Sequence, residues 1–294
     1  MTKLTCGPVR AQIDATRGFE IASVTVDGAQ ILARADWERA PAVPVATPQE
    51  WVAAWSGGWQ LAFPSAGTAA LSAPCPQGYH GAASQTPWTL LAESPDHARA
   101  QWRDAAGLVA EREIGLTEDG VVVRTTATNL SSAPRPIMIT EHLALGGDIL
   151  AADAAIDAPG TEGRPLDAAG APAGPFEPWP GSADPPWSVA RAGVTPARDM
   201  VLRNIGESGV EVTGGGITAR VTWDTAALPH MWLWQEIAAI TAPPWNGVTR
   251  ALGIEPATTA HALGVEAAAA AGDCPVLGPG AGLSWWVRLA VSTR

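Results

Sequence analysis

Positive charge, cysteine and most aromatic residue types are scarce in this chain of 294 residues, which has one lysine (Lys3), one tyrosine and three phenylalanines. Acidic residues outnumber Lys and Arg by 29 to 18, giving a formal net charge of -11. This charge disfavours nucleic acid and anionic membrane surfaces as partners. Cys6, Cys75 and Cys274 are an odd, widely spaced set without a Cys-x-x-Cys pair, which argues against a disulfide framework or a zinc knuckle and predicts reduced thiols.

Long apolar runs and the common catalytic signatures are also missing. No window approaches 18 uninterrupted apolar residues and the first residues form no apolar leader, so we expect a soluble cytoplasmic protein. The absence of His-x-His and His-Glu-x-x-His spacing disfavours a metal, and the absence of Gly-x-Ser-x-Gly disfavours a serine nucleophile. We therefore expect no cofactor, and the sequence gives no indication of the oligomeric state.

Alternating patterns and turn residues predict strands along much of the chain. Residues 111–129 contain two β-prone runs around Asp119-Gly120, which is a strong hairpin signal. Residues 210–223 predict a second hairpin, in which the glycines at 214–216 supply the positive φ of the turn. Residues 283–291 alternate with period two and predict a C-terminal strand.

Helical patterns are rare, since the alanine-rich run at 265–271 is long enough for only a turn or two of helix. The chain has 31 glycines and 26 prolines spread along its length, as expected for many short strands joined by turns. The sequence predicts an all-β fold, a large antiparallel β-sandwich forming a single domain over residues 1–294. Residues 151–198 are too proline-dense for central strands, and we expect a long excursion in which Trp179 and Trp187 favour a binding rim.

Three residue types suited to proton transfer stand out. His80 lies in Tyr-His-Gly, His142 in Thr-Glu-His-Leu, and Glu255 in Gly-Ile-Glu-Pro. A glutamate and histidines could act as paired acid and base on one substrate. The 14 tryptophans are suited to stacking on sugars, although the near absence of lysine favours compositional bias as the main cause of their number.

The ordered set of motifs resembles the aldose 1-epimerase, or galactose mutarotase-like, family over nearly the whole chain. The matching segments are Gly18 to Leu32, Phe63-Pro-Ser-Ala-Gly67, Tyr79-His-Gly81 followed by Trp88, Thr140-Glu-His-Leu, Gly253-Ile-Glu-Pro-Ala-Thr-Thr and Leu277-Gly-Pro-Gly. Each motif is weak alone, and their order and spacing carry the resemblance. It implies interconversion of the α and β anomers of a free aldose or modified sugar by ring opening and closure.

The resemblance also implies roles for individual residues. Glu255 would be the general base and His142 the general acid, while His80 would hydrogen-bond the ring oxygen or a nearby hydroxyl. Because a nearby carboxylate favours imidazolium, we expect ionised Glu255 beside protonated His142. Further residues are candidates for binding the sugar, namely Asp199, His230, Trp234 and Trp88, with Trp245 as another stacking candidate.

Departures from the family pattern bear on the substrate. Met200 follows Asp199 where many relatives have a histidine, and the segment around Ser65 lacks the asparagine and arginine that many members use. Ala82-Ala83-Ser84 follows His-Gly where the hexose 6-phosphate branch has Phe-Ala-Arg, which disfavours a phosphorylated substrate. Sulfonated and uronic sugars stay open.

Other readings of these residues remain. A non-catalytic carbohydrate-binding protein of the same fold is the main alternative, and a glycosidase could use Glu255 and Asp199 as its two carboxylates. His230 could be structural, in a buried strand. His97 and His261 are predicted to lie at the surface.

Overall fold

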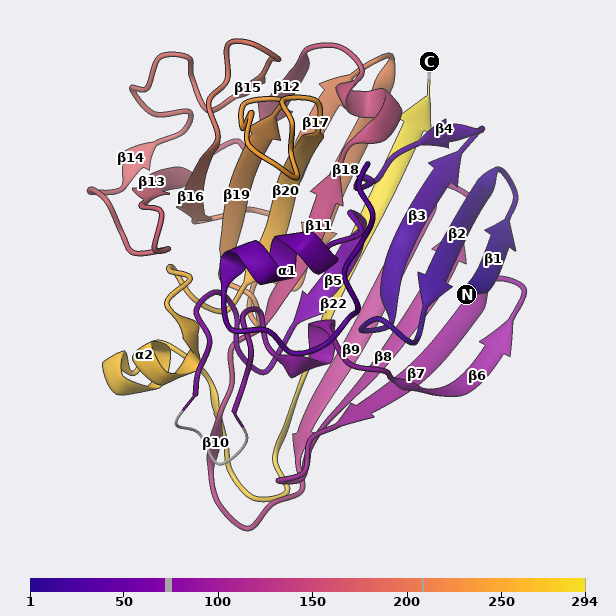
Figure 1. Cartoon of the computed structure of the whole chain (residues 1–294), viewed down its shortest axis with the longest axis vertical. Coiled ribbons are helices and arrows are strands. Elements are labelled where there is room, and N and C mark those ends of the chain that lie inside the picture. Colours follow the sequence, from indigo (N-terminus) through magenta and orange to yellow (C-terminus); the bar gives the residue numbers. More distant parts are fainter. Residues whose placement is uncertain (72–75, 208, 294) are drawn as a thin grey trace.

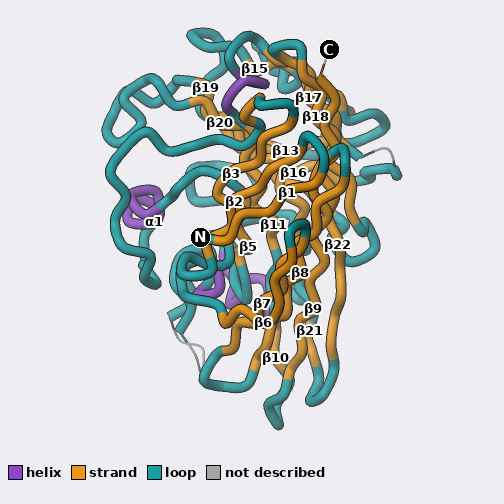
Figure 2. The backbone as a smooth tube through the Cα atoms, turned by 90° about the vertical axis from the view of Figure 1, so that its right-hand side faces the viewer, coloured by secondary structure: helices purple, strands orange, loops and turns teal. Residues whose placement is uncertain are grey.

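Two large antiparallel sheets pack face to face in the computed structural model, which describes residues 1–71, 76–207 and 209–293 (Figures 1 and 2). One sheet has the strand order β1-β2-β3-β5-β11-β20-β19-β16-β13-β14, with β4 paired to β3. Its strands are β1 (Thr2–Cys6), β2 (Val9–Asp14), β3 (Glu20–Val26), β4 (Ala29–Gln30), β5 (Trp59–Ala62), β11 (Thr140–Leu145), β13 (Glu162–Leu166), β14 (Glu177–Pro178), β16 (Arg198–Arg203), β19 (His230–Ile237) and β20 (Arg250–Ala257). We call this sheet the front sheet.

The second sheet, which we call the back sheet, has the order β15-β12-β17-β18-β22-β9-β8-β7-β6. Its strands are β6 (Thr89–Ser94), β7 (His97–Arg103), β8 (Leu108–Thr117), β9 (Gly120–Asn129), β12 (Ala154–Asp157), β15 (Val189–Ala190), β17 (Val210–Gly214), β18 (Ile217–Trp223) and β22 (Gly282–Thr293). A small ribbon pairs β10 (Arg135–Pro136) with β21 (Val276–Leu277). The prediction of a large antiparallel β-sandwich is confirmed.

The predicted hairpins are also confirmed. Strands β8 and β9 turn at residues 118–119, and β17 and β18 turn at Gly215 and Gly216, both of which have positive φ. Strand β22 buries the alternating residues Trp285, Val287, Leu289 and Val291, as the period-two pattern predicts.

The space between the sheets is filled by one large apolar core, which also contains a buried ion pair. Arg112 of β8 donates to both carboxylate oxygens of Glu141 in β11, at 2.7 and 2.8 Å. The indoles of Trp59 and Trp285 donate to the same carboxylate at 2.7 Å each. A buried charge is tolerated when it is paired and hydrogen-bonded, so this network ties β11 to the back sheet.

The proline-rich excursion at 151–198 forms short strands at the ends of the two sheets. Strands β12 and β15 extend the back sheet, while β13 and β14 extend the front sheet. Trp187 is buried in the main core and Trp179 packs against that core, so neither indole forms the expected rim. The part of the excursion that does reach a cavity is residues 166–170.

Two short helices and two single 3-10 turns complete the described structure. Helix α2 (Gly264–Ala271) is the predicted alanine-rich helix, and the 3-10 turns are η1 (Ala82–Ser84) and η2 (Gly147–Leu150). Helix α1 (Pro48–Ala54) was not expected, although Thr47 and Glu50 form a capping box and Pro48 occupies the first turn. It crosses the outer face of the front sheet, away from the back sheet (Figure 1).

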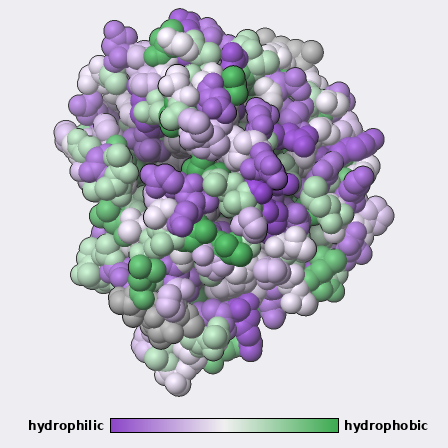
Figure 3. Space-filling model, in the orientation of Figure 1, coloured by the Kyte–Doolittle hydropathy of each residue, from purple (hydrophilic) through white to green (hydrophobic). Residues whose placement is uncertain are grey.

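Hydrophilic and hydrophobic residues are mixed on the face that α1 crosses (Figure 3). None of the helices in the described residues is long and apolar enough to cross a membrane. Cys6 and Cys274 are free thiols, in agreement with the prediction, and Cys75 lies outside the described residues.

Candidate active site

A cavity of about 560 Å³ opens on the outer face of the front sheet. Its floor consists of side chains from β11, β16, β19 and β20, and its walls come from α1, the Tyr79-His80 turn, residues 166–170 and the loop 240–245. Five of the seven predicted site residues line it: His80, His142, Asp199, Trp234 and Glu255. Side chains separated by up to 175 positions in the chain thus share one concave surface, which is the usual form of a small-molecule site.

Strand register brings four of these residues together. Leu143 of β11 lies opposite Ile254 of β20, so the preceding residue His142 lies beside Glu255. Trp234 of β19 lies opposite Gly253 of β20 and also opposite Asp199 of β16. Residues one step further along each strand face the core between the sheets, since side chains alternate across a strand.

Gly253 leaves room for the Glu255 carboxylate. A Cβ at this position would overlap Oε1 of Glu255 and approach the Trp234 side chain. The carboxylate therefore lies over the bare backbone of its own strand, and any larger residue at 253 would displace it. This steric requirement explains the glycine in Gly-Ile-Glu-Pro.

A tight turn holds His80 in the cavity wall. His80 has a positive φ of 59°, and its backbone N–H donates to the Gly67 carbonyl at 3.0 Å. The Gly67 N–H in return donates to Nδ1 of His80 at 3.2 Å. Since Nδ1 accepts, the neutral imidazole carries its proton on Nε2, and burial together with His142 lowers the pKa of His80 well below its ordinary value.

Glu255 and His142 form a close, buried pair. Nε2 of His142 lies 3.7 Å from Oε1 of Glu255, and both side chains are almost fully enclosed. Burial lowers the pKa of His142 to about 4, while burial and the nearby Asp199 raise the pKa of Glu255 well above its ordinary value. This differs from the expected ionised Glu255 and protonated His142, because desolvation outweighs their mutual attraction.

Both descriptions of the pair contain a single proton. Ionised glutamate with imidazolium and protonated glutamate with neutral imidazole differ only in where that proton lies, so the two groups titrate as a unit. The structure favours the second form. One member of the pair can always donate and the other can always accept.

Asp199 and Tyr79 add polar groups near this pair. Burial raises the pKa of Asp199 to about 6, and burial together with Asp199 and Glu255 raises the pKa of Tyr79. Tyr79 therefore keeps its hydroxyl proton at neutral pH. Asp199 titrates close to neutrality, and both are positioned to bind hydroxyl groups.

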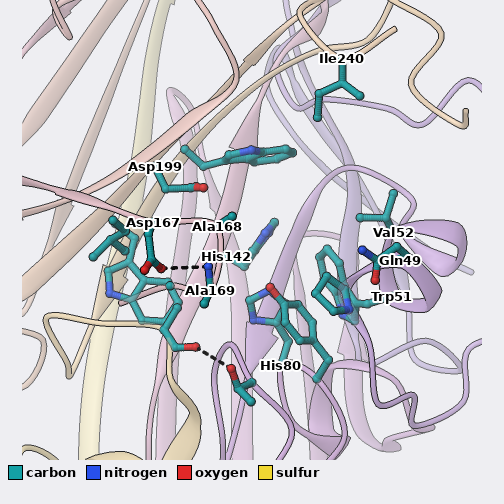
Figure 4. Close-up of a pocket in the computed structure, with 18 of the residues that line it drawn as sticks. Gln49, Trp51, Val52, His80, His142, Asp167, Ala168, Ala169, Asp199 and Ile240 are labelled. Carbon is teal, nitrogen blue, oxygen red and sulfur yellow. Dashed lines mark hydrogen bonds between the residues drawn. The ribbon is translucent and has the colours of Figure 1, made fainter. Parts of the chain in front are cut away.

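Trp51 of α1 shields the two histidines from solvent. Its ring centroid lies 4.6 Å from that of His80 and 5.1 Å from that of His142, both edge to face. Figure 4 shows Trp51 beside His80 on one side of the cavity and Asp199 on the other. Trp51 and Trp55, with Trp245 and Ala144, belong to an apolar cluster on this outer face, so α1 is held there by aromatic packing.

The structure does not bring Trp88 or His230 to the cavity. Trp88 stacks on Phe19 in the main core at a centroid distance of 5.9 Å, and its indole donates to the Ala83 carbonyl. His230 is the first residue of β19, two residues before Trp232 on the same face of the strand, and it lies outside the cavity. Burial, followed by the positive charge of Arg164 and Arg203, lowers the pKa of His230. Trp88 therefore packs in the core, and His230 lies outside the cavity.

The two histidines predicted at the surface have different outcomes. His97 is partly exposed, and its Nε2 lies 3.1 Å from Glu113. The prediction for His261 is wrong, because only 6% of this residue is exposed and its Nδ1 accepts from the Leu263 N–H. The small residues around His261 allow close packing over it.

Sequence reasoning missed other residues of the cavity wall. Trp51, Trp232 and Asp167 were not singled out, and Tyr79 was noted only as part of a motif. The capping box at Thr47 could have located α1, whereas no local pattern indicates that 166–170 folds back over the sheet. Within the described residues, no group of three or more His, Cys, Asp or Glu side chains could hold a metal ion.

Comparisons with known proteins agree with this architecture. Residues 1–291 match the model of a family described as "Domain of unknown function (DUF4432)". No curated protein matches the sequence.

Solved structures share the fold at low sequence identity. The Slr1438 protein from Synechocystis sp. PCC 6803 is 16% identical with a TM-score of 0.72, over 100% of this chain and 96% of that one. A protein from Escherichia coli K12 named "putative aldose 1-epimerase" is 15% identical with a TM-score of 0.71, over 99% of this chain and 98% of that one. A galactose mutarotase-like protein from Lactobacillus casei is 16% identical with a TM-score of 0.69, over 99% of this chain and 100% of that one. The fold is therefore that of the galactose mutarotase-like proteins.

Proposed function

Because the chain belongs to the family described as a domain of unknown function, DUF4432, and has the galactose mutarotase-like fold, we propose that it is an aldose 1-epimerase. The single observation that carries the proposal is the Glu255–His142 pair, 3.7 Å apart at the floor of the cavity with His80 beside it. The substrate is a free aldose or a modified, non-phosphorylated sugar. Neither a cofactor nor a covalent adduct is required.

The proposed reaction moves one proton through the pair. Ionised Glu255 removes the proton of the C1 hydroxyl, the bond from C1 to the ring oxygen breaks, and protonated His142 gives its proton to that oxygen. The products are an open-chain aldehyde with a new hydroxyl, protonated Glu255 and neutral His142. Rotation about the bond between C1 and C2 and the reverse transfers close the ring as the other anomer.

The electrostatics of the pair suit this sequence. Ring opening converts the charged form of the pair into the neutral form, which burial favours. The two forms are linked by the reaction itself, so no proton has to be exchanged with solvent between opening and closing. General acid and base catalysis of this kind contributes about 10² to 10⁴ in rate.

His80 and the aromatic walls would orient the sugar. With Nδ1 occupied by the Gly67 N–H, the Nε2–H of His80 is free to donate to the ring oxygen or an adjacent hydroxyl. Trp51, Trp232 and Trp234 provide apolar surface for the faces of the ring. Trp51 also excludes water from the imidazoles, which strengthens the hydrogen bonds made within the site.

Exchange NMR on equilibrated aldoses tests the proposal. We expect the enzyme to accelerate the exchange of α and β anomer signals of at least one free aldose above the buffer rate. Polarimetry on freshly dissolved α-anomers gives the same information. Binding of sugars without acceleration would contradict the proposal and support a carbohydrate-binding protein.

A further inference from the structure

The residues that line the cavity include three carboxylates and no arginine or lysine. The carboxylates belong to Asp167, Asp199 and Glu255, and all the lining residues lie within the described part of the chain. The remaining lining side chains are aromatic, aliphatic or uncharged polar groups, together with the two histidines whose neutral forms burial favours. The cavity thus holds three carboxyl groups and no fixed positive charge.

The nearest arginines in the sequence are engaged elsewhere. Arg198 precedes Asp199 on β16 and points to the opposite face, where it donates to Gln235, Pro185 and Pro186 and covers the Trp187 ring. Alternation along the strand separates the two side chains. Asp199 therefore cannot be neutralised by its neighbour.

Arg164 of β13 lies on the cavity side of the front sheet but is directed elsewhere. Its guanidinium lies 4.5 Å from the centroid of the Phe176 ring and donates to the Ala260 carbonyl. It does not line the cavity.

The carboxylates are largely without partners in the protein. Among the described residues, none donates a hydrogen bond to the carboxylate of Asp199, and the carboxylate of Glu255 has only His142 at 3.7 Å. Glu255 is 3% exposed and faces into the cavity. An ionised carboxylate that lines a cavity without donors is unfavourable, so the geometry favours a ligand that brings donors and positive charge.

Aromatic rings surround the same space. Trp51, Trp232, Trp234, Trp245 and Tyr79 all line the cavity. Indole faces attract ammonium groups, and aromatic rings combined with carboxylates are the usual protein environment for an organic cation. This second feature is independent of the carboxylates and favours the same kind of ligand.

We propose that the substrate is an aldose that carries a protonated amino group. The ammonium group binds on the side of the cavity formed by Asp167 and Asp199, and the anomeric carbon faces Glu255 and His142. Figure 4 shows Asp167 and Asp199 on one side of the cavity and Trp51, Val52 and Gln49 on the other. Asp167 contributes because only its Oδ1 accepts from the backbone, at Ala169 and Ala171, which leaves Oδ2 for a ligand.

This inference rests on the proposed function and narrows its substrate class. Phosphorylated, sulfonated and uronic sugars would place an anion among the three carboxylates, and we expect them to be poor substrates. Neutral aldoses would lack the charge that balances Asp199.

Matched sugar pairs test the proposal by exchange NMR near neutral pH, with the buffer rate of each sugar subtracted. Glucose and 2-amino-2-deoxyglucose differ by one hydroxyl replaced by an ammonium group, as do galactose and 2-amino-2-deoxygalactose. The 3-amino and 6-amino isomers show which position of the sugar the ammonium group must occupy. Glucuronate and glucose 6-phosphate test sugars of the opposite charge. We expect kcat/KM for the best amino sugar to exceed that of its neutral partner about tenfold or more, since a hydrogen bond between charged groups contributes that much.

Charge removal in the cavity provides the second arm of the test. Asp167→Asn should reduce the ratio of kcat/KM between amino and neutral sugar several-fold. Asp157→Asn is the matched control, because Asp157 is exposed on β12 of the back sheet, and it should leave the ratio unchanged. An unchanged ratio in Asp167→Asn would remove Asp167 from the ammonium site.

The outcomes separate the two proposals. Faster exchange of neutral or anionic sugars than of every amino sugar would overturn the substrate assignment and leave the epimerase intact. If no sugar is accelerated, the epimerase fails, and tryptophan fluorescence titration of the same pairs decides the charge preference. Tighter binding of the amino sugars would then support an amino sugar as the ligand of the cavity, and equal or absent binding would overturn that preference as well.

Discussion

Asp199 and His142 face the same cavity, and burial shifts their pKa values in opposite directions. Burial raises the pKa of Asp199 to about 6 and lowers the pKa of His142 to about 4. A group whose pKa differs between the folded and unfolded states makes the free energy of unfolding depend on pH. Removing each group in turn should therefore give two opposite pH dependences.

For Asp199 the folded pKa is above the unfolded value of about 3.9. Its contribution to stability is then fully present below about pH 4 and is lost as the pH rises through about 6. The shift corresponds to about 3 kcal/mol at most. We expect Asp199→Asn to match the wild type near pH 4 and to be more stable by up to about 3 kcal/mol above about pH 7.

For His142 the folded pKa is below the unfolded value of about 6.5. Its contribution is present above about pH 6.5 and is lost as the pH falls through about 4. The His142→Gln variant should therefore gain stability relative to the wild type as the pH falls from about 7 to about 4. Its free energy of unfolding minus that of the wild type should rise by up to about 3 kcal/mol. A constant offset from lost packing against Trp51 does not affect this slope.

Urea unfolding between about pH 4 and pH 8, followed by tryptophan fluorescence, measures both differences. The quantity to plot is the variant minus the wild-type free energy of unfolding, because carboxylates away from the cavity contribute equally to both proteins. Asp157→Asn, at an exposed position of β12 outside the cavity, is the matched control. Two slopes of the same sign, or two flat lines, would refute the assignment of neutral, buried forms to these groups.

Three further substitutions test the packing around the site. Gly253→Ala should slow anomer exchange by about 10²-fold, because its methyl group displaces the Glu255 carboxylate, which we propose as the base. Gly278→Ala, which has open space around it, should not change the NMR exchange rate. Trp51→Ala should admit water and raise the pKa of His142 from about 4 toward its ordinary value. An unchanged NMR titration of the His142 ring would contradict the shielding role of Trp51. Glu141→Gln should lower the free energy of unfolding in urea by about 3 to 5 kcal/mol, because it leaves the buried guanidinium of Arg112 without its countercharge. The control Glu211→Gln, which breaks an ion pair at the surface, should lower it by less than about 1 kcal/mol.

Five strands of the back sheet, β8, β9, β17, β18 and β22, could be predicted because each carries its own local signal. In β22 the alternation of Trp285, Val287 and Leu289 with polar or exposed neighbours depends only on one face being buried. The hairpin at Asp119-Gly120 likewise depends on its own turn residues. Such features need no knowledge of distant parts of the chain.

The meeting of His142 and Glu255 has a different origin. It depends on the register between β11 and β20, which are separated by more than 100 residues, and no local pattern specifies that register. The family resemblance indicated that the two residues act together. Their distance and the resulting loss of charge by burial required the structure.

The missed residues show where local patterns stop being informative. The capping box at Thr47 locates α1, but the contact of Trp51 with two histidines is a tertiary contact made by a helix of seven residues. Trp88 was assigned to the sugar site because it follows the His80 motif. Its side chain instead turns into the core against Phe19, since the 3-10 turn η1 intervenes.

The role of Glu255 as the base is the central claim, and Glu255→Gln tests it most directly because the amide keeps the shape and loses the proton acceptor. We expect exchange NMR on the best aldose to show anomer exchange slowed by about 10²-fold or more relative to the wild type, with sugar binding retained. The control Glu111→Gln, in a partly exposed ion pair on the back sheet, should exchange anomers at the wild-type rate. Exchange by Glu255→Gln at the wild-type rate would contradict the account.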